Sequence, residues 1–293
     1  MKVGRVLYVG MVSLTLLLGG CSTHQQSMAS NPSGEITVVS RETGSGTRDA
    51  FIEQVGLLEK DHHHRIDQTT LEAIVQNSTA GVVSTVAGLE QAIGYVSLGT
   101  MSNLVQPVAI EGVWPSTQTI LAGEYPLQRP FVICWPNEVR GEVTDFIAFI
   151  NSKEGQDIIK QTGYVPTNPN ALPYQNTQVE EGLITIVGST SVTPVMEQLA
   201  ENYQEIYSGV QIDIISNGST AGITAVEEGT ADIGMSSRSL NTQEMEQANS
   251  QVIALDGIVI IVNPENPLNR LSLQEVHDIF KGDITDWQNL VQY

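Results

Sequence analysis

The stretch LITIVGSTSVTPVMEQL, residues 183–199, runs from an apolar strand through a small hydroxylated turn into a helix. The same order occurs in VVSRETGSGTRDAF at 38–51 and in IISNGSTAGITAV at 214–226. A helix N-terminus presents unpaired N–H groups and partial positive charge, glycine permits close approach of the backbone, and serine or threonine adds a hydroxyl. One such turn is a common structural device, but three that converge would form a dehydrated oxyanion site.

Strand-like and helix-like stretches alternate along most of the chain, which predicts an α/β fold. The predicted strands include 92–98, 106–110 and 210–216, with an extended segment at 129–135 and a long apolar run at 252–263. The predicted helices include 47–55, 79–89, 142–150, 152–162, 192–207 and a polar helix near 241–249. A polar stretch at 173–182 separates two halves, and no simple repeat of fixed period relates them.

The N-terminus has the pattern of a secretion signal. Lys2 and Arg5 precede an apolar run at 6–18 that is too short to span a bilayer comfortably, and LGGC follows at 18–21. This ending resembles the lipobox of bacterial lipoproteins, which implies a signal peptide at 1–20, lipidation of Cys21 and a flexible tether at 21–34. The alternative is an ordinary cleaved signal with a chance cysteine.

Composition limits the function classes. The chain has 293 residues, of which 41% are hydrophobic and 16% charged, and this is enough apolar material for two modest lobes or one large domain. Loss of the two signal cations would take the formal charge from −20 to about −22, which argues against nucleic acid or an anionic membrane surface as a partner but not against a small anion. Cys134 lies in an apolar run and is predicted to be a buried thiol without a disulfide partner.

Several motifs of enzymes and metalloproteins are missing from the sequence. There is no G-x-x-x-x-G-K-[ST], so a nucleotide P-loop is not expected. The adjacent histidines at 62–64 cannot all face one ion, and no metal or cofactor is expected. The GSGT turn does not match the G-x-S-x-G nucleophile motif, so Ser45 is not expected to be a nucleophile and the chain is not expected to be an enzyme.

Longer stretches resemble the phosphate-binding lipoproteins of bacterial phosphate ABC transporters, which have the two-lobed type 2 periplasmic-binding-protein fold. They cover nearly everything from about 36 to 290 and include GSTSVTPVMEQLAENY at 188–203, NGSTAGITAVEEGTADIGMSSR at 217–238, IALDGIVIIVN at 253–263 and DFIAFINSKEGQDIIKQTGYVP at 145–166. The resemblance implies a monomer that binds inorganic phosphate in a cleft between α/β lobes and delivers it to ABC permease subunits. It would be extracytoplasmic and held at the membrane by its lipid anchor. A receptor for sulfate or another oxyanion, or a phosphate-responsive sensory or adhesive lipoprotein, is the alternative.

The resemblance also implies the binding residues, all of which lie in the repeated turns. Arg41 would pair with the anion, because an arginine fork suits a tetrahedral oxyanion. Donors would come from the helix opening beside it and from the facing lobe: Ser45, Gly46, Thr47, Thr190, Ser191 and Ser219.

The turn GMSSR at 234–238 departs from part of the family. Some members have an aspartate there, which accepts the proton of monohydrogen phosphate and so helps to reject sulfate. Here the position is Ser237, whose hydroxyl can still accept a hydrogen bond. Asp256 is a candidate replacement acceptor, or alternatively a capping or hinge-proximal aspartate.

The order of the matching stretches is inverted relative to the family, in which GSTSV opens the mature domain and RETGSGTR follows ITDW. Each stretch occurs once, which predicts a circular permutation, with the old ends joined through 173–182. One lobe would comprise 35–102 plus 264–293 and carry RETGSGTR, and the other would comprise 103–263. The rival explanations are a chain clipped from a tandem protein and a domain-swapped arrangement.

Overall fold

The computed structural model describes residue 1 and residues 33–61, 64–175, 179 and 181–290. The predicted signal peptide, Cys21, most of the tether and the first two histidines of 62–64 therefore lie outside the described residues. Within the described ranges, no helix is both long enough and apolar enough to cross a membrane.

A ten-stranded mixed sheet forms the framework. Its main path runs in the order β11 (Val210–Ser216), β10 (Gly182–Gly188), β12 (Ile233–Ser236), β8 (Gln128–Trp135), β13 (Asn249–Val262), β5 (Ala92–Ser97), β1 (Thr37–Arg41) and β4 (Ile74–Gln76). The short strands β6 (Gln106–Pro107) and β9 (Val165–Pro166) pair with β13 beside this path. The outer strands on both sides are parallel, whereas β8 and β13 are antiparallel to their neighbours.

The long strand β13 belongs to two cores. Its residues 258–262 pair with β5, while its residues 249–257 pair with β8. Strands β8 and β13 therefore connect two lobes, each with its own apolar layers. The first lobe is built on β1, β4 and β5, and the second lobe is built on β10, β11 and β12.

In the first lobe, alternate residues of each strand face opposite layers, as the period of a strand requires. Val38 packs with α1 (Gly46–Gln54) and α9 (Leu273–Lys281), whereas Val39 packs with α2 (Thr79–Gly88). Ile260 and Ile261 of β13 divide between the same two layers. The sheet is thus covered by helices on both faces.

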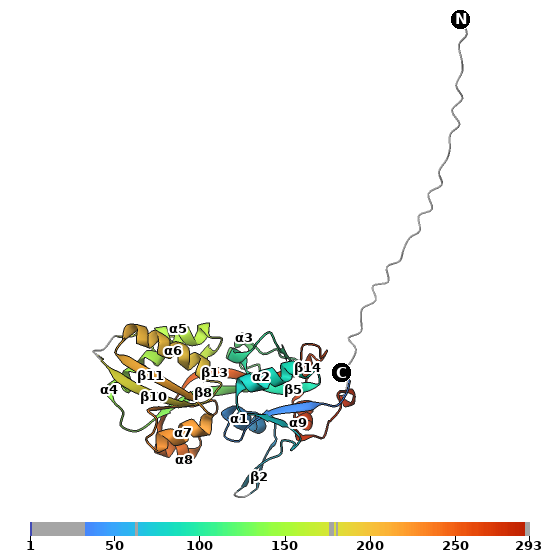
Figure 1. Ribbon diagram of the computed structural model, residues 1–293, viewed down its shortest axis with the longest axis horizontal. Coiled ribbons are helices and arrows are strands. Elements are labelled where there is room, and N and C mark those ends of the chain that lie inside the picture. Colours follow the sequence, from blue (N-terminus) through green and yellow to red (C-terminus); the bar gives the residue numbers. More distant parts are fainter. Residues whose placement is uncertain (2–32, 62–63, 176–178, 180, 291–293) are drawn as a thin grey trace. The chain divides into compact units, whose positions relative to one another are not determined.

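The second lobe repeats this design. Ile186 packs with α4 (Gly141–Asn151), α5 (Lys153–Gln161) and α6 (Thr193–Ile206), and Val187 packs with α7 (Ser219–Glu227). Figure 1 shows β10 and β11 between α5 and α6 on one side and α7 and α8 (Thr242–Gln247) on the other. Cys134 is buried in the α7 layer as a free thiol, and burial raises its pKa to about 12.

The predicted two-lobed α/β fold is confirmed, but the lobe boundary differs from the one drawn from the sequence. We expected 103–263 to form the second lobe. Val108, Ile110 and Tyr125 instead pack in the first core with Ile36 and Phe51, and so do alternate residues of 258–262. The cause is that the apolar faces of 105–110 and 258–262 complete the sheet formed by β1 and β5.

The short strand predicted at 106–110 occurs as β6 and β7 (Ala109–Ile110). Several other short elements were not predicted. They include the hairpin of β2 (Leu58–Asp61) and β3 (His64–Asp67), helix α3 (Thr117–Leu121), strand β14 (Arg270–Leu271), which pairs with β7, and the 3₁₀ turns η1 (Leu98–Thr100) and η2 (Trp287–Asn289). None has a long periodic pattern by which sequence could reveal it.

The two ends of the described domain lie side by side. Glu35 and Asp286 form an antiparallel bridge, the N–H of Ile36 donates to the carbonyl of Thr285 (2.8 Å), and the N–H of Trp287 donates to the carbonyl of Gly34 (3.1 Å). The first and last described segments are therefore fastened to each other by backbone hydrogen bonds.

Candidate functional site

Four strand-turn-helix junctions converge between the lobes. From the first lobe come the turns that lead from β1 into α1 and from β4 into α2, and from the second come those that lead from β10 into α6 and from β11 into α7. Thr47 of α1 contacts Ser191 before α6, and the N–H of Thr220 in α7 donates to the carbonyl of Gly44 (3.1 Å). The junctions predicted from sequence thus meet across the interlobe boundary.

The helix openings of the two lobes differ in their capping. Helices α1 and α2 begin with side-chain caps, because Ser45 accepts from the N–H of Arg48 and Ser78 accepts from the N–H of Gly81. Helices α6 and α7 begin after Val192 and Gly218, neither of which makes a side-chain cap. The N–H of Thr193 in α6 donates to the carbonyl of Ser189 (3.1 Å), and that of Thr220 in α7 donates to the carbonyl of Gly44. The positive end of each helix still suits an anion.

Buried hydroxyls line the space between these openings. Thr47 Oγ1 lies 3.0 Å from Ser191 Oγ, and Thr79 Oγ1 lies 3.3 Å from Ser191 Oγ and 3.1 Å from Thr190 Oγ1. We call the following set the hydroxyl cluster: Thr47, Thr79, Ser189, Thr190, Ser191, Ser219 and Ser237. Most of its members are almost wholly buried. Hydroxyl hydrogens rotate freely, so each O–H can turn from its neighbour toward an anion.

Arg41 supplies the positive charge beside the cluster. Its side chain is buried, with 2% exposed, and its Nε and Nη2 donate to the two carboxylate oxygens of Glu42 at 2.8 Å each. Nη1 contacts Thr79 Oγ1 at 3.4 Å, a long bond that leaves donor capacity on that nitrogen. Glu42 therefore fixes the orientation of the guanidinium while Nη1 faces the cluster.

Two glycines permit the close approach of the turns. A Cβ at Gly46 would lie 2.2 Å from Ser219 Oγ and 2.9 Å from Ser237 Oγ, so only glycine fits where α1 meets the second lobe. Gly188 has φ 145°, and a Cβ there would lie 2.2 Å from the carbonyl oxygen of Met235. Its absence lets the β10 turn pack against β12.

Ser237 has hydroxyl neighbours rather than a carboxylate. Ser189 Oγ donates to Ser237 Oγ (2.9 Å), Ser219 Oγ lies 3.4 Å away, and the N–H of Ser237 donates to Ser219 Oγ (3.0 Å). An acceptor for the proton of monohydrogen phosphate would here be a hydroxyl oxygen.

Asp256 lies behind the cluster instead of in it. Its Oδ2 accepts from Nε and Nη2 of Arg129 at 3.0 and 2.9 Å, and its Oδ1 accepts from the N–H of Leu98 at 3.1 Å. Both side chains of the ion pair are 0% exposed. Burial raises the pKa of Asp256 and lowers that of Arg129, and their mutual attraction opposes both shifts. The pair joins β8 to β13, so the hinge-proximal alternative fits Asp256 better than an anion acceptor.

The structure brings most of the predicted site residues together. Arg41, Gly46, Thr47, Ser191 and their predicted partners Thr190, Ser219 and Ser237 are brought together. Ser45 is used locally, since its N–H donates to the carbonyl of Glu42 and its hydroxyl caps α1.

Two members of the hydroxyl cluster were missed. Thr79 opens α2 in the motif NSTAG at 77–81, which parallels the NGSTAG of 217–222, and this likeness could have revealed it. Ser189 stands in the GSTS turn next to the predicted Thr190, but its inward direction depends on Gly188.

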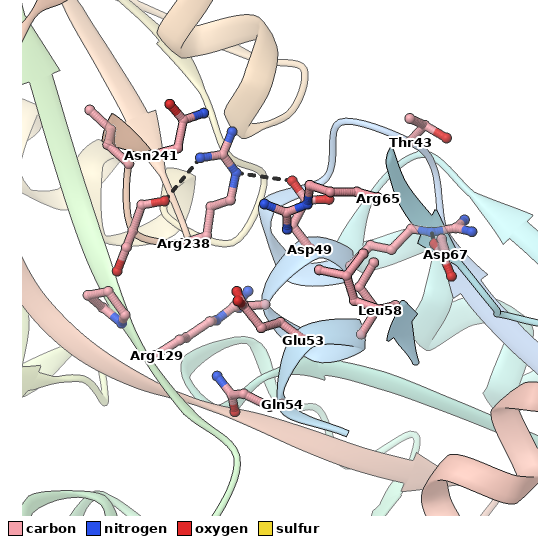
Figure 2. Close-up of a pocket in the computed structure, with 16 residues that line it drawn as sticks. Thr43, Asp49, Glu53, Gln54, Leu58, Arg65, Asp67, Arg129, Arg238 and Asn241 are labelled. Atoms are coloured by element: carbon pink, nitrogen blue, oxygen red, sulfur yellow. Dashed lines mark hydrogen bonds and ion pairs between the residues drawn. The ribbon is translucent and has the colours of Figure 1, made fainter. Parts of the chain in front are cut away.

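A groove with a volume of about 670 Å³ lies outside the cluster, along α1. Figure 2 shows its walls, which come from α1, the hairpin of β2 and β3, the start of β8 and residues 238–241 of the second lobe. Its charged lining is mixed: Arg48, Asp49, Glu53, Arg65, Asp67, Arg129 and Arg238. Within the described part of the chain, no group of three or more histidine, cysteine, aspartate or glutamate side chains could hold a metal ion.

Comparison with known proteins places this geometry in a family. The model of the PBP superfamily domain matches residues 9–154 and 173–292. The phosphate-binding protein PstS 2 of Streptococcus pneumoniae serotype 4 is 44% identical over 99% of this chain and 100% of its own length. The chain belongs to the PBP superfamily, among the PstS phosphate-binding proteins.

Two further members show the same likeness. PstS 2 of Streptococcus agalactiae serotype V is 42% identical over 94% of this chain and 93% of its own length. The crystal structure of a phosphate-binding protein of a phosphate ABC transporter from Streptococcus pneumoniae is 46% identical and superposes with a TM-score of 0.72 over 88% of this chain and 100% of that one. These PstS relatives align with the chain over nearly its whole length.

Proposed function

We propose that this protein captures inorganic phosphate between its lobes for an ABC importer. The observation that carries the proposal is the buried hydroxyl cluster, enclosed by helix N-termini from both lobes and flanked by the oriented guanidinium of Arg41. Such a site offers many donors at hydrogen-bond range in a water-poor space, where local dipoles act strongly on an anion. Its similarity to the phosphate-binding proteins of Streptococcus pneumoniae and Streptococcus agalactiae supports phosphate as that anion.

Because each lobe supplies donors that the other lacks, binding is expected to favour the closed arrangement. Thr47 and Thr79 belong to the first lobe, and Ser191 belongs to the second. An anion that bonds to all three would hold the lobes together. We propose that permease subunits receive the phosphate when the lobes separate.

The proposal is tested by calorimetric titration of the purified protein with phosphate. We expect saturable binding with one site per chain, and Arg41→Ala should weaken it at least about hundredfold, since a charge-assisted donor is lost and Glu42 is left unpaired. Arg140→Ala is the matched control, because Arg140 is an exposed arginine paired with Asp232 away from the site. Absence of phosphate binding by the folded wild-type protein would refute the proposal.

Anion selectivity is a separate part of the proposal. A carboxylate at position 237 would repel an anion without a proton, such as sulfate, whereas the hydroxyl of Ser237 does not. We therefore propose that phosphate is preferred over sulfate by only a modest margin. Competition calorimetry with sulfate measures that margin. A Ser237→Asp variant should widen it, and an unchanged margin in the variant would show that selectivity arises elsewhere.

We further propose that the protein is extracytoplasmic, anchored to the membrane through lipidated Cys21, and a monomer. The LGGC sequence at 18–21 supports the anchor. Mass spectrometry of the protein purified from membranes of its host should find an acylated Cys21 at the N-terminus. A mature N-terminus elsewhere would contradict it, and light scattering of the purified protein tests the monomer.

The protein is also proposed to bind phosphate without hydrolysing phosphoesters. His277 has its Nδ1 engaged with the carbonyl of Val55, away from the hydroxyl cluster. Incubation with a chromogenic phosphoester should release no product above a buffer control. Turnover that disappears in Arg41→Ala would overturn this assignment.

Circular permutation remains our explanation for the chain order. The backbone segments 34–36 and 285–287 are hydrogen-bonded to each other, and this proximity supports a former connection between them. The joining segment is held at Tyr174, whose N–H donates to Glu154 (2.6 Å) and whose hydroxyl donates to Asp145. A rearranged chain, with its present ends linked and new ends opened at 176–178, should fold and bind phosphate with unchanged affinity. Failure to fold would count against the permutation.

A further inference from the structure

Arg238 bridges the two lobes just outside the hydroxyl cluster. It follows Ser237 in the second lobe, and its Nε donates to Oδ2 of Asp49 in α1 of the first lobe at 3.0 Å. Its Nη1 and Nη2 donate to the two carboxylate oxygens of Glu244 at 2.8 Å each, and Nη1 also donates to the carbonyl of Ser239 at 3.0 Å. Glu244 and Ser239 thus hold the guanidinium in place within its own lobe, so that its free edge points across the boundary.

Asp49 lies one helical turn after Gly46, on the element that carries the first-lobe donors. The ion pair and the anion site therefore share both of their supports, the opening of α1 and the turn at 236–238. The other ion pairs recorded for the described residues lie within one lobe or, for Arg129 and Asp256, join the hinge strands β8 and β13. The pair of Arg238 and Asp49 is placed to respond when α1 separates from the second lobe.

Neither partner would be left isolated when the lobes open. Arg238 would retain Glu244, and Figure 2 shows Arg65 of the hairpin beside Asp49 in the groove. Burial raises the pKa of Asp49, and attraction to Arg238, Arg65 and Arg48 opposes that rise. Since each charge keeps a neighbour of opposite sign, the free energy of opening at this pair is little more than that of the bond between Arg238 and Asp49.

The pair is only partly buried, which bounds its effect. The side chains of Arg238 and Asp49 are 16% and 30% exposed, and both border the groove of about 670 Å³. Solvent in the groove screens the attraction, so the pair is weaker than a fully buried one. This strength suits a contact that must break in every transport cycle.

We propose that the ion pair between Arg238 and Asp49 holds the lobes closed over the bound anion and sets the rate of phosphate release. The inference rests on the proposed function and adds to it a pair of residues that act without touching the ligand. Their role is positional, because they act through the contact between α1 and the turn at 236–238.

The test is a stopped-flow measurement of phosphate association and release by the full chain, with wild type, Asp49→Asn, Arg238→Gln and the double variant. Asp49→Asn is the cleaner change, because its carboxylate binds Arg238 while Arg238 has further partners in its own lobe. We expect Asp49→Asn to raise the release rate about fivefold, with an association rate changed less than about twofold. The double variant should release phosphate about as fast as the faster single variant, because both substitutions remove the same bond.

Asp232→Asn is the matched control. Asp232 is an aspartate of comparable exposure, 25%, whose ion pair with Arg140 lies within the second lobe. It should lower the unfolding midpoint without changing the release rate, whereas Asp49→Asn should change release with little effect on the midpoint. This contrast separates control of closure from a general loss of stability.

Three results would overturn the inference. A release rate in Asp49→Asn equal to that of the wild type would remove the role of the pair, and so would fully additive effects in the double variant. Equal acceleration in Asp232→Asn would assign the effect to stability. If the wild-type protein does not bind phosphate at all, the proposed function fails, and a role of this pair in phosphate release fails with it.

Discussion

Gly46→Ala should weaken anion binding while leaving the fold intact. The added Cβ would lie 2.2 Å from Ser219 Oγ, 2.8 Å from Ser219 Cβ and 2.9 Å from Ser237 Oγ in the closed arrangement. Rotation of the Ser219 hydroxyl cannot relieve the contact between the added Cβ and the Cβ of Ser219. Since the contact is between lobes, it can be relieved by keeping them apart, and no core residue has to move.

The size of the effect follows from the cost of overpacking. Forcing an extra methyl group into a well-packed contact costs about 1–3 kcal/mol, and at about 1.4 kcal/mol per tenfold change this predicts a phosphate affinity lower by about 5- to 150-fold. Stability should not fall, because alanine is favoured over glycine in a helix by up to about 1 kcal/mol. Calorimetric titration gives the affinity, and denaturation by urea gives the free energy of unfolding.

Gly88→Ala is the control for the helix effect. Gly88 ends α2, and a Cβ there has no heavy atom within 4 Å, so affinity should not change. Unchanged affinity in Gly46→Ala would show that the lobes do not close through this contact when phosphate binds. A large loss of stability in Gly46→Ala would show that the contact belongs to the fold rather than to closure.

Three further substitutions probe the site and its support. Thr79→Val keeps the shape of the side chain but removes the hydroxyl beside Arg41, so phosphate affinity should fall about tenfold without loss of stability; an unchanged affinity in calorimetry would exclude Thr79 from the site. Asp256→Asn leaves the buried guanidinium of Arg129 without its counter-charge and should lower the free energy of unfolding by about 3–5 kcal/mol in urea denaturation, and a loss below about 1 kcal/mol would mean that the pair is not the hinge support described. Burial acts to raise the pKa of Asp67, but hydrogen bonds from Thr69 and Arg48 outweigh it, so the folded pKa lies below the ordinary value of 3.8. The contribution of this carboxylate to stability is therefore present above pH 3.8 and is lost as the pH falls through the lower folded pKa. Urea denaturation at a series of acidic pH values should therefore show a shallower loss of stability for Asp67→Asn than for the wild type, and equal slopes would contradict this.

Sequence was sufficient for the elements with strong local patterns. The strand and helix of 183–199 occur as β10 and α6, with a boundary shift of one or two residues, because the apolar run, the glycine turn and the helical periodicity all favour the same structure. The strand predicted at 210–216 coincides with β11, and the long apolar run noted at 252–263 forms most of β13. Local consistency of this kind also revealed the turns that carry Arg41, Ser191 and Ser219.

Features that depend on long-range packing were beyond the sequence. The lobe boundary was misplaced because residues 258–262 are apolar throughout, and an apolar pattern alone does not show which of the two lobes a strand joins. The partner of Asp256 was not predicted because Arg129 lies 127 positions away in the chain and nothing in its own sequence context distinguishes it from a surface arginine. The role proposed for Arg238 likewise depends on α1 approaching its turn, which only the folded arrangement shows.

The central claim is that a tetrahedral anion binds within the hydroxyl cluster between the lobes. A crystal structure of the protein grown with phosphate tests it most directly. The account predicts tetrahedral density within hydrogen-bond distance of Arg41 Nη1 and of hydroxyls from both lobes, Thr47 or Thr79 on one side and Ser191 or Ser219 on the other. Phosphate density in the arginine-lined groove along α1, with the hydroxyl cluster bonded only to itself, would contradict it.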